Sequence, residues 1–208
     1  MDETSRKRGH NYVSLFVDLD TPKVVFATEG KDASTVKRFK QDLADHNGNP
    51  EAIEEICSDM SPSFISGVEK YFSNAHLTFN KFHIMKVIDE AFDEVRRQEQ
   101  KDHPEEVFRT RYIWLKNAEN LKASQAETLD GLSVKRLNLK TSRAYHIKLN
   151  VQELFNQPVE YAKIYLTKWY FWATHRRFGP IKEAAYKIKR HWDGVLQWFN
   201  SGVNNGIL

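Results

Sequence analysis

The sequence contains only one cysteine, Cys57, in 208 residues, and this scarcity excludes an internal disulfide. Chains without disulfides are typical of a reducing compartment. The sequence also lacks an apolar run long enough to cross a membrane, and its first residues lack the pattern of a secretory signal peptide. Together these absences predict a cytoplasmic protein of bacterial type.

Motifs for several common chemistries are also missing. The stretch GVNNG near the C-terminus lacks the Lys-Ser/Thr ending of a phosphate-binding loop. A single cysteine cannot supply the Cys/His spacing of a zinc site. His10 and His83 have no paired ligand nearby in the sequence, so we interpret both as hydrogen-bonded structural residues.

Aromatic residues, in contrast, are plentiful: the chain has 13 Phe, 8 Tyr and 5 Trp, enough to bury a substantial core. Charge is distributed unevenly. Residues 1–100 carry 13 Lys and Arg against 18 Asp and Glu, whereas residues 101–208 carry 18 against 10. An acidic half joined to a basic half suggests that the second half meets a polyanion, although solvated helix surfaces produce the same pattern.

The first hundred residues alternate between strand and helix patterns. The segments NYVSLFVDLD and VVFATEG, joined by TPK, predict a hairpin, and AIEEICSD and AHLTFN predict two more strands. Helices are predicted from Ser34, from Ser61 as the cap before Pro62, and from Lys81. The core-facing stripe of the last helix is predicted to be Phe82, Met85, Ile88, Phe92 and Val95. This alternation predicts a layered α/β fold.

After Lys101 only helices are predicted. The segments KWYFWATHRRF and KIKRHWDGVLQWF interleave aromatics with cations, a mixture that can hold phosphates and stack on unpaired bases. The tryptophans at helical spacing are interpreted as bundle core: Trp169, Trp172, Trp192 and Trp198. The basic face opposite them is the candidate DNA-binding surface: Arg176, Arg177, Lys182, Lys187, Lys189 and Arg190.

Three acidic positions are candidates for metal chemistry. Asp59 stands where a predicted strand passes into a helix, the place where α/β folds bind ligands. Asp2 precedes the first predicted strand, in a segment too short for a full strand, and Asp18 ends that strand. Taken singly, each acid fits a structural role better than a catalytic one. Taken together, carboxylates from different strands suit a pair of Mg²⁺ ions, which can activate an attacking oxygen and stabilise a leaving one.

Six blocks then occur in a fixed order: DETSRKRGHNYVSLFVDLDTPKVVFATEGKDASTVKRF, CSDMSPSF, AHLTFNKFHIMKVIDEAFDEVRR, YIWLKNAENLKASQAETL, AYHIKLNVQELF and FNSGVNNGIL. No block is specific by itself. Collectively they resemble the DDE transposase domain of the ISL-three group of bacterial insertion sequences, over essentially the whole chain.

The resemblance implies a ribonuclease H-like mixed sheet with a large all-α insertion, and two Mg²⁺ ions held by Asp, Asp and Glu. It implies hydrolysis of a phosphodiester at a transposon end, followed by attack of the freed 3′-hydroxyl on target DNA. Asp2 corresponds to the first acid and Asp59 to the second, with Asp18 as the fallback for the first. The implied partners are transposon-end and target DNA and a second copy of the chain, in the bacterial cytoplasm near the nucleoid.

The chain departs from the family pattern in ways that bear on activity. In the family, NGIL continues into a Glu-Gly-x-Asn helix that brings the third acid, whereas this sequence stops at Leu208. Likewise, no strand precedes Asp2, and Asn80 stands where the family often has Asp. We therefore expect an incomplete catalytic core in residues 1–100, a helical insertion in 101–200, and in 201–208 a loop leading to a missing catalytic helix.

The incomplete ligand set leads us to expect weak Mg²⁺ binding and no strand transfer from these 208 residues alone. Two alternatives stay open. One is a non-catalytic DNA-binding remnant that acts through the basic helical half, and the other is a different metal nuclease of the same fold. Salt-dependent DNA binding without Mg²⁺-dependent cleavage would favour the remnant over a catalytic domain.

Overall fold

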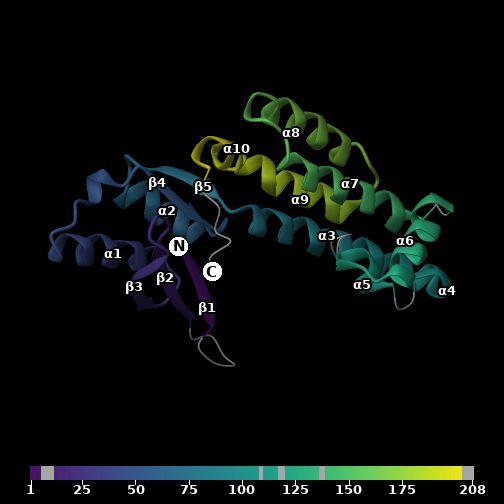
Figure 1. Ribbon diagram of the computed structural model, residues 1–208, viewed down its shortest axis with the longest axis horizontal. Coiled ribbons are helices and arrows are strands. Elements are labelled where there is room, and N and C mark those ends of the chain that lie inside the picture. The colour runs from purple at the N-terminus through teal and green to yellow at the C-terminus, as the bar shows by residue number, and fades with distance from the viewer. Residues whose placement is uncertain (6–11, 108–109, 117–119, 136–138, 203–208) are drawn as a thin grey trace. The chain divides into compact units, whose positions relative to one another are not determined.

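The computed structural model describes residues 1–5, 12–107, 110–116, 120–135 and 139–202 (Figure 1). The chain divides into two compact units, Met1–His83 with the chain from His191 onward, and Ile84–Arg190. These divisions differ from the predicted boundaries at residues 100 and 200. The long helix that begins at Lys81 belongs to the second unit from Ile84 on, and the last helix belongs to the first unit.

The first unit contains two small sheets, so the chain is an α/β protein. Their strands are β1 (Asp2–Ser5), β2 (Tyr12–Asp18) and β3 (Lys23–Glu29), which are antiparallel in that order, and β4 (Glu55–Ser58) and β5 (His76–Phe79), which are parallel. Strand β2 alternates as expected for a half-buried strand, with Ser14 and Phe16 buried. The predicted hairpin is confirmed, as are the predicted strands in AIEEICSD and AHLTFN.

The segment that begins at Asp2 forms a strand, contrary to the expectation that it is too short. Its backbone pairs with β2 from Asp2 opposite Leu15 to Ser5 opposite Tyr12. The pairing partner lies seven or more residues further along the chain, so the strand depends on a contact that the segment's own four residues do not reveal.

Helices α1 (Ala33–Asp45) and α2 (Pro62–Tyr71) pack against each other in this unit, and a short 3₁₀ turn, η1 (Pro50–Ala52), follows α1. The side chain of Asp32 caps α1 by accepting a hydrogen bond of 2.7 Å from Ser34 N. At the crossing, a Cβ on Gly67 would overlap Val36, so glycine permits the close approach. The buried hydrophobic cluster of the unit is Met1, Phe16, Val36, Phe64, Val68 and Phe72.

Helix α10 (Trp192–Ser201) packs on β5, beside which it lies in Figure 1. The contact is close because Gly194 has no side chain, and a Cβ there would overlap the buried ring of Phe79. The Gln197 side chain also donates a hydrogen bond to the Glu55 carboxylate of β4. The last helix therefore covers the two-stranded sheet, although it is more than a hundred residues distant in sequence.

Helix α3 (Lys81–Asp102) buries a different stripe from the predicted one at its start. Phe82 is 66% exposed, whereas Ile84 is fully buried and Ile88, Phe92 and Val95 continue the buried stripe. Phe82 is exposed because it lies two residues, about 200° around the helix, from Ile84 and therefore on the opposite side from the buried stripe. The helix begins beside it, and Phe82 N donates to the Asn80 side chain at 2.9 Å.

The described residues of the second unit form helices and their connections, without a strand, as predicted. Its further helices are α4 (Pro104–Val107), α5 (Arg111–Leu115), α6 (Ala123–Lys135), α7 (Lys140–Leu154), α8 (Val159–Thr174) and α9 (Gly179–Arg190). Helices α4 and α5 are separate, and α9 ends at Arg190 before α10 starts. Among the described helices, none is both long and apolar enough to span a membrane.

The interpretation of the tryptophans as core is confirmed for Trp169, which is 1% exposed and donates from Nε1 to Ile147 O at 3.1 Å. It is wrong in part for the others, because Trp172, Trp192 and Trp198 are only half-buried. Trp114, which the helical spacing did not single out, is 1% exposed and packs edge-on against Tyr145 at 5.1 Å between ring centroids. Burial raises the pKa of the Tyr145 hydroxyl.

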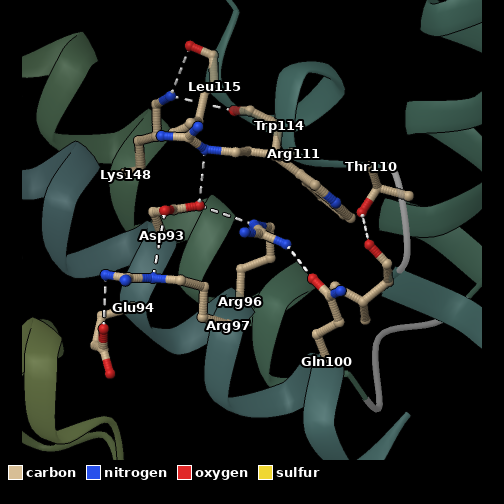
Figure 2. A network of polar contacts seen from close by, with 11 residues as sticks. Asp93, Glu94, Arg96, Arg97, Gln100, Thr110, Arg111, Trp114, Leu115 and Lys148 are labelled. Carbon is tan, nitrogen blue, oxygen red and sulfur yellow. Dashed lines mark hydrogen bonds and ion pairs between the residues drawn. The ribbon is translucent and has the colours of Figure 1, made fainter. Parts of the chain in front are cut away.

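A network of charged side chains joins α3 to α5. The Asp93 carboxylate accepts from Arg96 Nε at 2.8 Å and lies 3.5 Å from the Nε atoms of Arg97 and Arg111. Figure 2 shows the three guanidinium groups directed towards Asp93, while Arg96 also donates to Gln100 at 2.7 Å. Because the Arg96 side chain is only 6% exposed, its partners are needed to compensate the loss of water.

Two buried charges satisfy helix ends in the second unit. The Glu99 carboxylate, 3% exposed, accepts from the backbone N–H groups of Lys140 and Thr141 at the start of α7, at 2.7 and 2.6 Å. Lys148, 2% exposed, donates to Trp114 O and Leu115 O at the end of α5, at 3.2 and 3.3 Å. Both charges have the sign that complements the helix dipole, and so they fix α3, α5 and α7 together.

Candidate functional site

Asp59 directly follows β4 and precedes α2, as the sequence predicted, and its side chain is half-buried. Its Oδ1 accepts a hydrogen bond of 2.9 Å from Ser61 N. Ser61 occupies the cap position of α2, yet its own side chain makes no capping bond, which corrects the expectation that Ser61 caps the helix through its hydroxyl. Asp59 therefore starts the helix with one oxygen, and its Oδ2 has no hydrogen-bond partner among the described residues.

The start of β1 lies against the end of β4. The Met1 amino group donates to Cys57 O over 2.6 Å, in a buried position. Asp2 is the next residue along β1, and Asp59 is two residues beyond Cys57. The side chain of Asp2 lies outside what the structure describes, so the two residues are related here by their backbones alone.

Asp18 is the last residue of β2, where the turn that leads to β3 begins. Both of its oxygens accept hydrogen bonds there: Oδ1 from Asp20 N at 3.0 Å and Oδ2 from Thr21 Oγ1 at 2.6 Å. The bond from the Thr21 hydroxyl is the main cause that lowers the pKa of the Asp18 carboxyl, with the Asp20 backbone N–H next. The structure thus gives Asp18 a turn-forming role.

The described side chains provide few of the donor atoms that a metal site needs. Among the side chains that the structure describes, no group of three His, Cys, Asp or Glu residues could hold a metal ion. Asp59 offers one carboxylate oxygen of the hard kind that Mg²⁺ prefers, at the carboxyl end of a strand. The described donors therefore fit one ligand of such a site. His10 lies outside the described residues, and so does the side chain of Asp2.

The candidate DNA-binding residues lie on α9 and the turn before it. Helix α9 buries Ile181, Ala184, Ala185 and Ile188, so its cations face away from the unit's interior. Arg176, Arg177, Lys189 and Arg190 are exposed, whereas Lys182 and Lys187 are half-buried. The prediction of an exposed basic face is therefore confirmed for four of the six cations, and the contact of these residues with DNA stays a prediction.

One further cation, Arg143, and one further histidine, His146, were missed by the sequence analysis. Arg143 and His146 of α7 line a hollow between α7 and α8, together with Trp172 of α8 and Arg176 of the turn that follows it. A spacing of three or four residues along α7 was a signal for a common face, but only the packing of α8 against α7 shows what that face meets.

Comparison with known proteins identifies the family of the chain. A family model described as a transposase, DDE_Tnp_ISL3, matches residues 1–208. The chain therefore belongs to the DDE transposase family of the ISL3 group.

The chain is similar to the transposases for insertion sequence element IS1557 from two Mycobacterium tuberculosis strains, CDC 1551 / Oshkosh and ATCC 25618 / H37Rv. Each is 25% identical over 236 residues, an alignment that covers 100% of this chain and 52% of the relative. The chain thus spans about half the length of these curated relatives. No solved structure matches it.

Proposed function

We propose that the chain carries the catalytic core of an insertion-sequence transposase, with Asp2 and Asp59 as metal ligands in a ribonuclease H-like sheet. The observation that carries this proposal is the bond from Met1 N to Cys57 O. This bond joins the residue before β1 to a residue of β4, and we propose that the two sheets belong to one mixed sheet in the complete domain, in the order β3-β2-β1-β4-β5. Asp2 and Asp59 then belong to adjacent strands at one rim.

At that rim Asp2 and Asp59 would hold Mg²⁺, and the metal would activate an attacking oxygen and stabilise a leaving one. The hydrogen bond from Ser61 N to Asp59 Oδ1 orients this carboxylate and leaves Oδ2 for ligation. We assign no third acidic ligand in this sequence. We therefore propose that these 208 residues do not perform strand transfer alone.

The proposed reaction of the complete enzyme has two steps. A water oxygen attacks the phosphorus at a transposon end, and the bond from phosphorus to the 3′-oxygen breaks, which leaves a 3′-hydroxyl. That hydroxyl then attacks a phosphorus of target DNA and displaces another 3′-oxygen. The partners are thus transposon ends and target DNA in the bacterial cytoplasm, and a homodimer would bring two ends together.

Paramagnetic Mn²⁺, which takes the same oxygen ligands as Mg²⁺, tests the shared site in the 208-residue chain even if binding is weak. We expect that a Mn²⁺ titration broadens the backbone amide NMR signals of Glu3 and Met60 over the same concentration range. Asp59→Asn should remove the broadening at both positions. Asp20→Asn, at an exposed turn acid, is the control that should change neither. Broadening near Met60 that leaves Glu3 unaffected would refute a site shared by β1 and β4.

Activity is tested in a full-length member of the family, where the acid corresponding to Asp59 is replaced by Asn. We expect Mg²⁺-dependent nicking of matched transposon ends to be lost, while binding to the same ends is retained. Nicking at the original rate would exclude the metal-ligand role of this position.

The exposed cations of α9 and of the turn before it support a second candidate, a DNA-binding domain without catalysis. Here the affinity for duplex DNA should fall with salt, whether or not Mg²⁺ is present. Replacement of Arg177 and Arg190 by Gln should lower the slope of log K against log salt by about one for each lost phosphate contact. An unchanged slope in the double variant would argue against this surface.

A further inference from the structure

The hollow between α7 and α8 has a volume of about 560 Å³. From α7 it is lined by Arg143, His146, Leu149, Asn150 and Glu153, from α8 by Trp172, and from the turn after α8 by Arg176. Four of the α7 residues, at positions 143, 146, 150 and 153, follow the three-and-four spacing of one helix face. A hollow of this size is within the range of small-molecule sites.

Charge is divided between the two ends of this hollow. Arg143 and Arg176 belong to the cationic end, where the Arg143 guanidinium lies 5.6 Å from the Phe178 ring centroid. Glu153 lies on the same face of α7, almost three helical turns from Arg143, and it accepts a hydrogen bond of 3.1 Å from Asn156. An extended polyanion that followed the whole hollow would meet the Glu153 carboxylate, so the hollow favours a single phosphate at one end.

The middle of the hollow combines an aromatic face with an amide. Trp172 is half-buried, and the Arg176 guanidinium lies 5.8 Å from its ring centroid. Leu149, 37% exposed, adds an apolar surface, and the exposed Asn150 carries both a donor and an acceptor. An aromatic face, an apolar wall and an amide suit the flat ring and the polar edge of a nucleobase.

We propose that this hollow binds one unpaired nucleotide of a DNA strand, with its base against Trp172 and its phosphate between Arg143 and Arg176. The inference rests on the proposed function, which supplies DNA as the partner. A base inside a duplex is stacked on both faces, so only a frayed or single-stranded segment offers a base to Trp172. The hollow would therefore hold a strand that has left its duplex.

The test measures binding of the 208-residue chain to a fluorescently labelled oligothymidine and to a blunt duplex of equal length, by fluorescence anisotropy. We expect Trp172→Ala to weaken binding to the single strand by about 5- to 150-fold, the usual range for loss of one base–aromatic stack. Binding to the duplex should change less than twofold. Arg176→Gln should likewise weaken single-strand binding more than duplex binding.

Matched controls come from α8, the helix that carries Trp172. Phe171, 62% exposed on α8, is an aromatic residue outside the hollow, and Lys163 is an exposed cation outside it. Phe171→Ala and Lys163→Gln should not alter the preference of the chain for the single strand. Because all the substituted side chains are exposed or only half-buried, the variants should unfold within a few degrees of the original chain.

The possible outcomes separate this inference from the proposed function. If the original chain binds the duplex, and Trp172→Ala binds the single strand as tightly as the original chain does, then the nucleotide site in the hollow is refuted. The proposed function would still stand. Binding to neither DNA would overturn both. If free thymidine 5′-monophosphate competes as strongly as the oligonucleotide, the hollow is a mononucleotide pocket and the assignment to a DNA strand is wrong.

Discussion

Replacement of Glu99 by Gln tests whether one buried carboxylate joins α3 to α7. Glu99 and Gln have nearly the same shape, so packing is preserved and the change falls on the hydrogen bonds. The carboxylate accepts from both Lys140 N and Thr141 N, whereas an amide has one oxygen and directs its NH₂ group at one of the two donors. One backbone N–H is then left without an acceptor in a buried place.

The expected cost has two parts. A buried donor without a partner costs about 1–3 kcal/mol, and the remaining hydrogen bond loses about 1 kcal/mol because the acceptor no longer carries charge. We therefore expect Glu99→Gln to lower the free energy of unfolding of the helical unit by about 2–4 kcal/mol. Glu94→Gln is the matched control on the same helix: its side chain is 41% exposed and paired with Arg97, so its loss should cost less than about 1 kcal/mol.

Urea unfolding followed by far-ultraviolet circular dichroism measures both variants. Because the chain has two compact units, the curves are fitted with two transitions and the second unit is identified by the fluorescence of its buried tryptophans. Amide hydrogen exchange at Lys140 and Thr141 reports the cap directly, and we expect it to accelerate in Glu99→Gln alone. If Glu99→Gln unfolds within about 0.5 kcal/mol of Glu94→Gln, the cap does not stabilise α7 as reasoned.

Three further substitutions test other contacts. Asp93→Ala leaves the buried Arg96 without its carboxylate, so we expect a loss of about 3–5 kcal/mol in urea unfolding, and a loss below 1 kcal/mol would contradict the network. Gly194→Ala forces α10 away from the buried Phe79 ring. The cost of overpacking should outweigh the gain in helix propensity, so we expect thermal unfolding to show the first unit destabilised by about 1–2 kcal/mol. Stabilisation would show that the helix can shift freely. Asp32→Ala removes the cap of α1 at a cost of about 1 kcal/mol at pH 7. Hydrogen bonds from the Ser34 side chain, and then from its backbone N–H, lower the pKa of the Asp32 carboxyl. The stabilisation by Asp32 is therefore present above pH about 4 and disappears as the pH falls through the lowered pKa. A difference in stability between the variant and the original chain that persists at pH 2 would contradict this.

The strands and helices that the sequence predicted correctly are those whose signals are local. The hairpin of β2 and β3 follows from alternation around a turn, and α1 from its periodicity after Asp32. Strand β1 was missed because its four residues become a strand only through pairing with β2. The place of α10 on β5 was missed for the same reason, since a contact across more than a hundred residues leaves no periodic trace in either segment.

In the candidate site, too, features with local signals could be predicted, whereas features that depend on distant contacts could not. The position of Asp59 between a strand and a helix could be predicted, because strand and helix signals meet at that residue. The bond between Met1 and Cys57 could not be predicted, because it depends on which strands are neighbours. The capping of α7 by Glu99 was equally hidden, since donor and acceptor are 41 and 42 residues apart.

Asp59 shows why a structural and a ligating role need not compete for one side chain. The bond from Ser61 N uses Oδ1 alone, and an Asn in the same place offers an equivalent oxygen to that N–H. Asp59→Asn therefore keeps the start of α2 while it removes the negative charge that a Mg²⁺ ion requires. Loss of the Mn²⁺ effect in a variant of unchanged stability can then be assigned to ligation and not to local unfolding, a separation that Asp59→Ala, which also removes the turn, could not give.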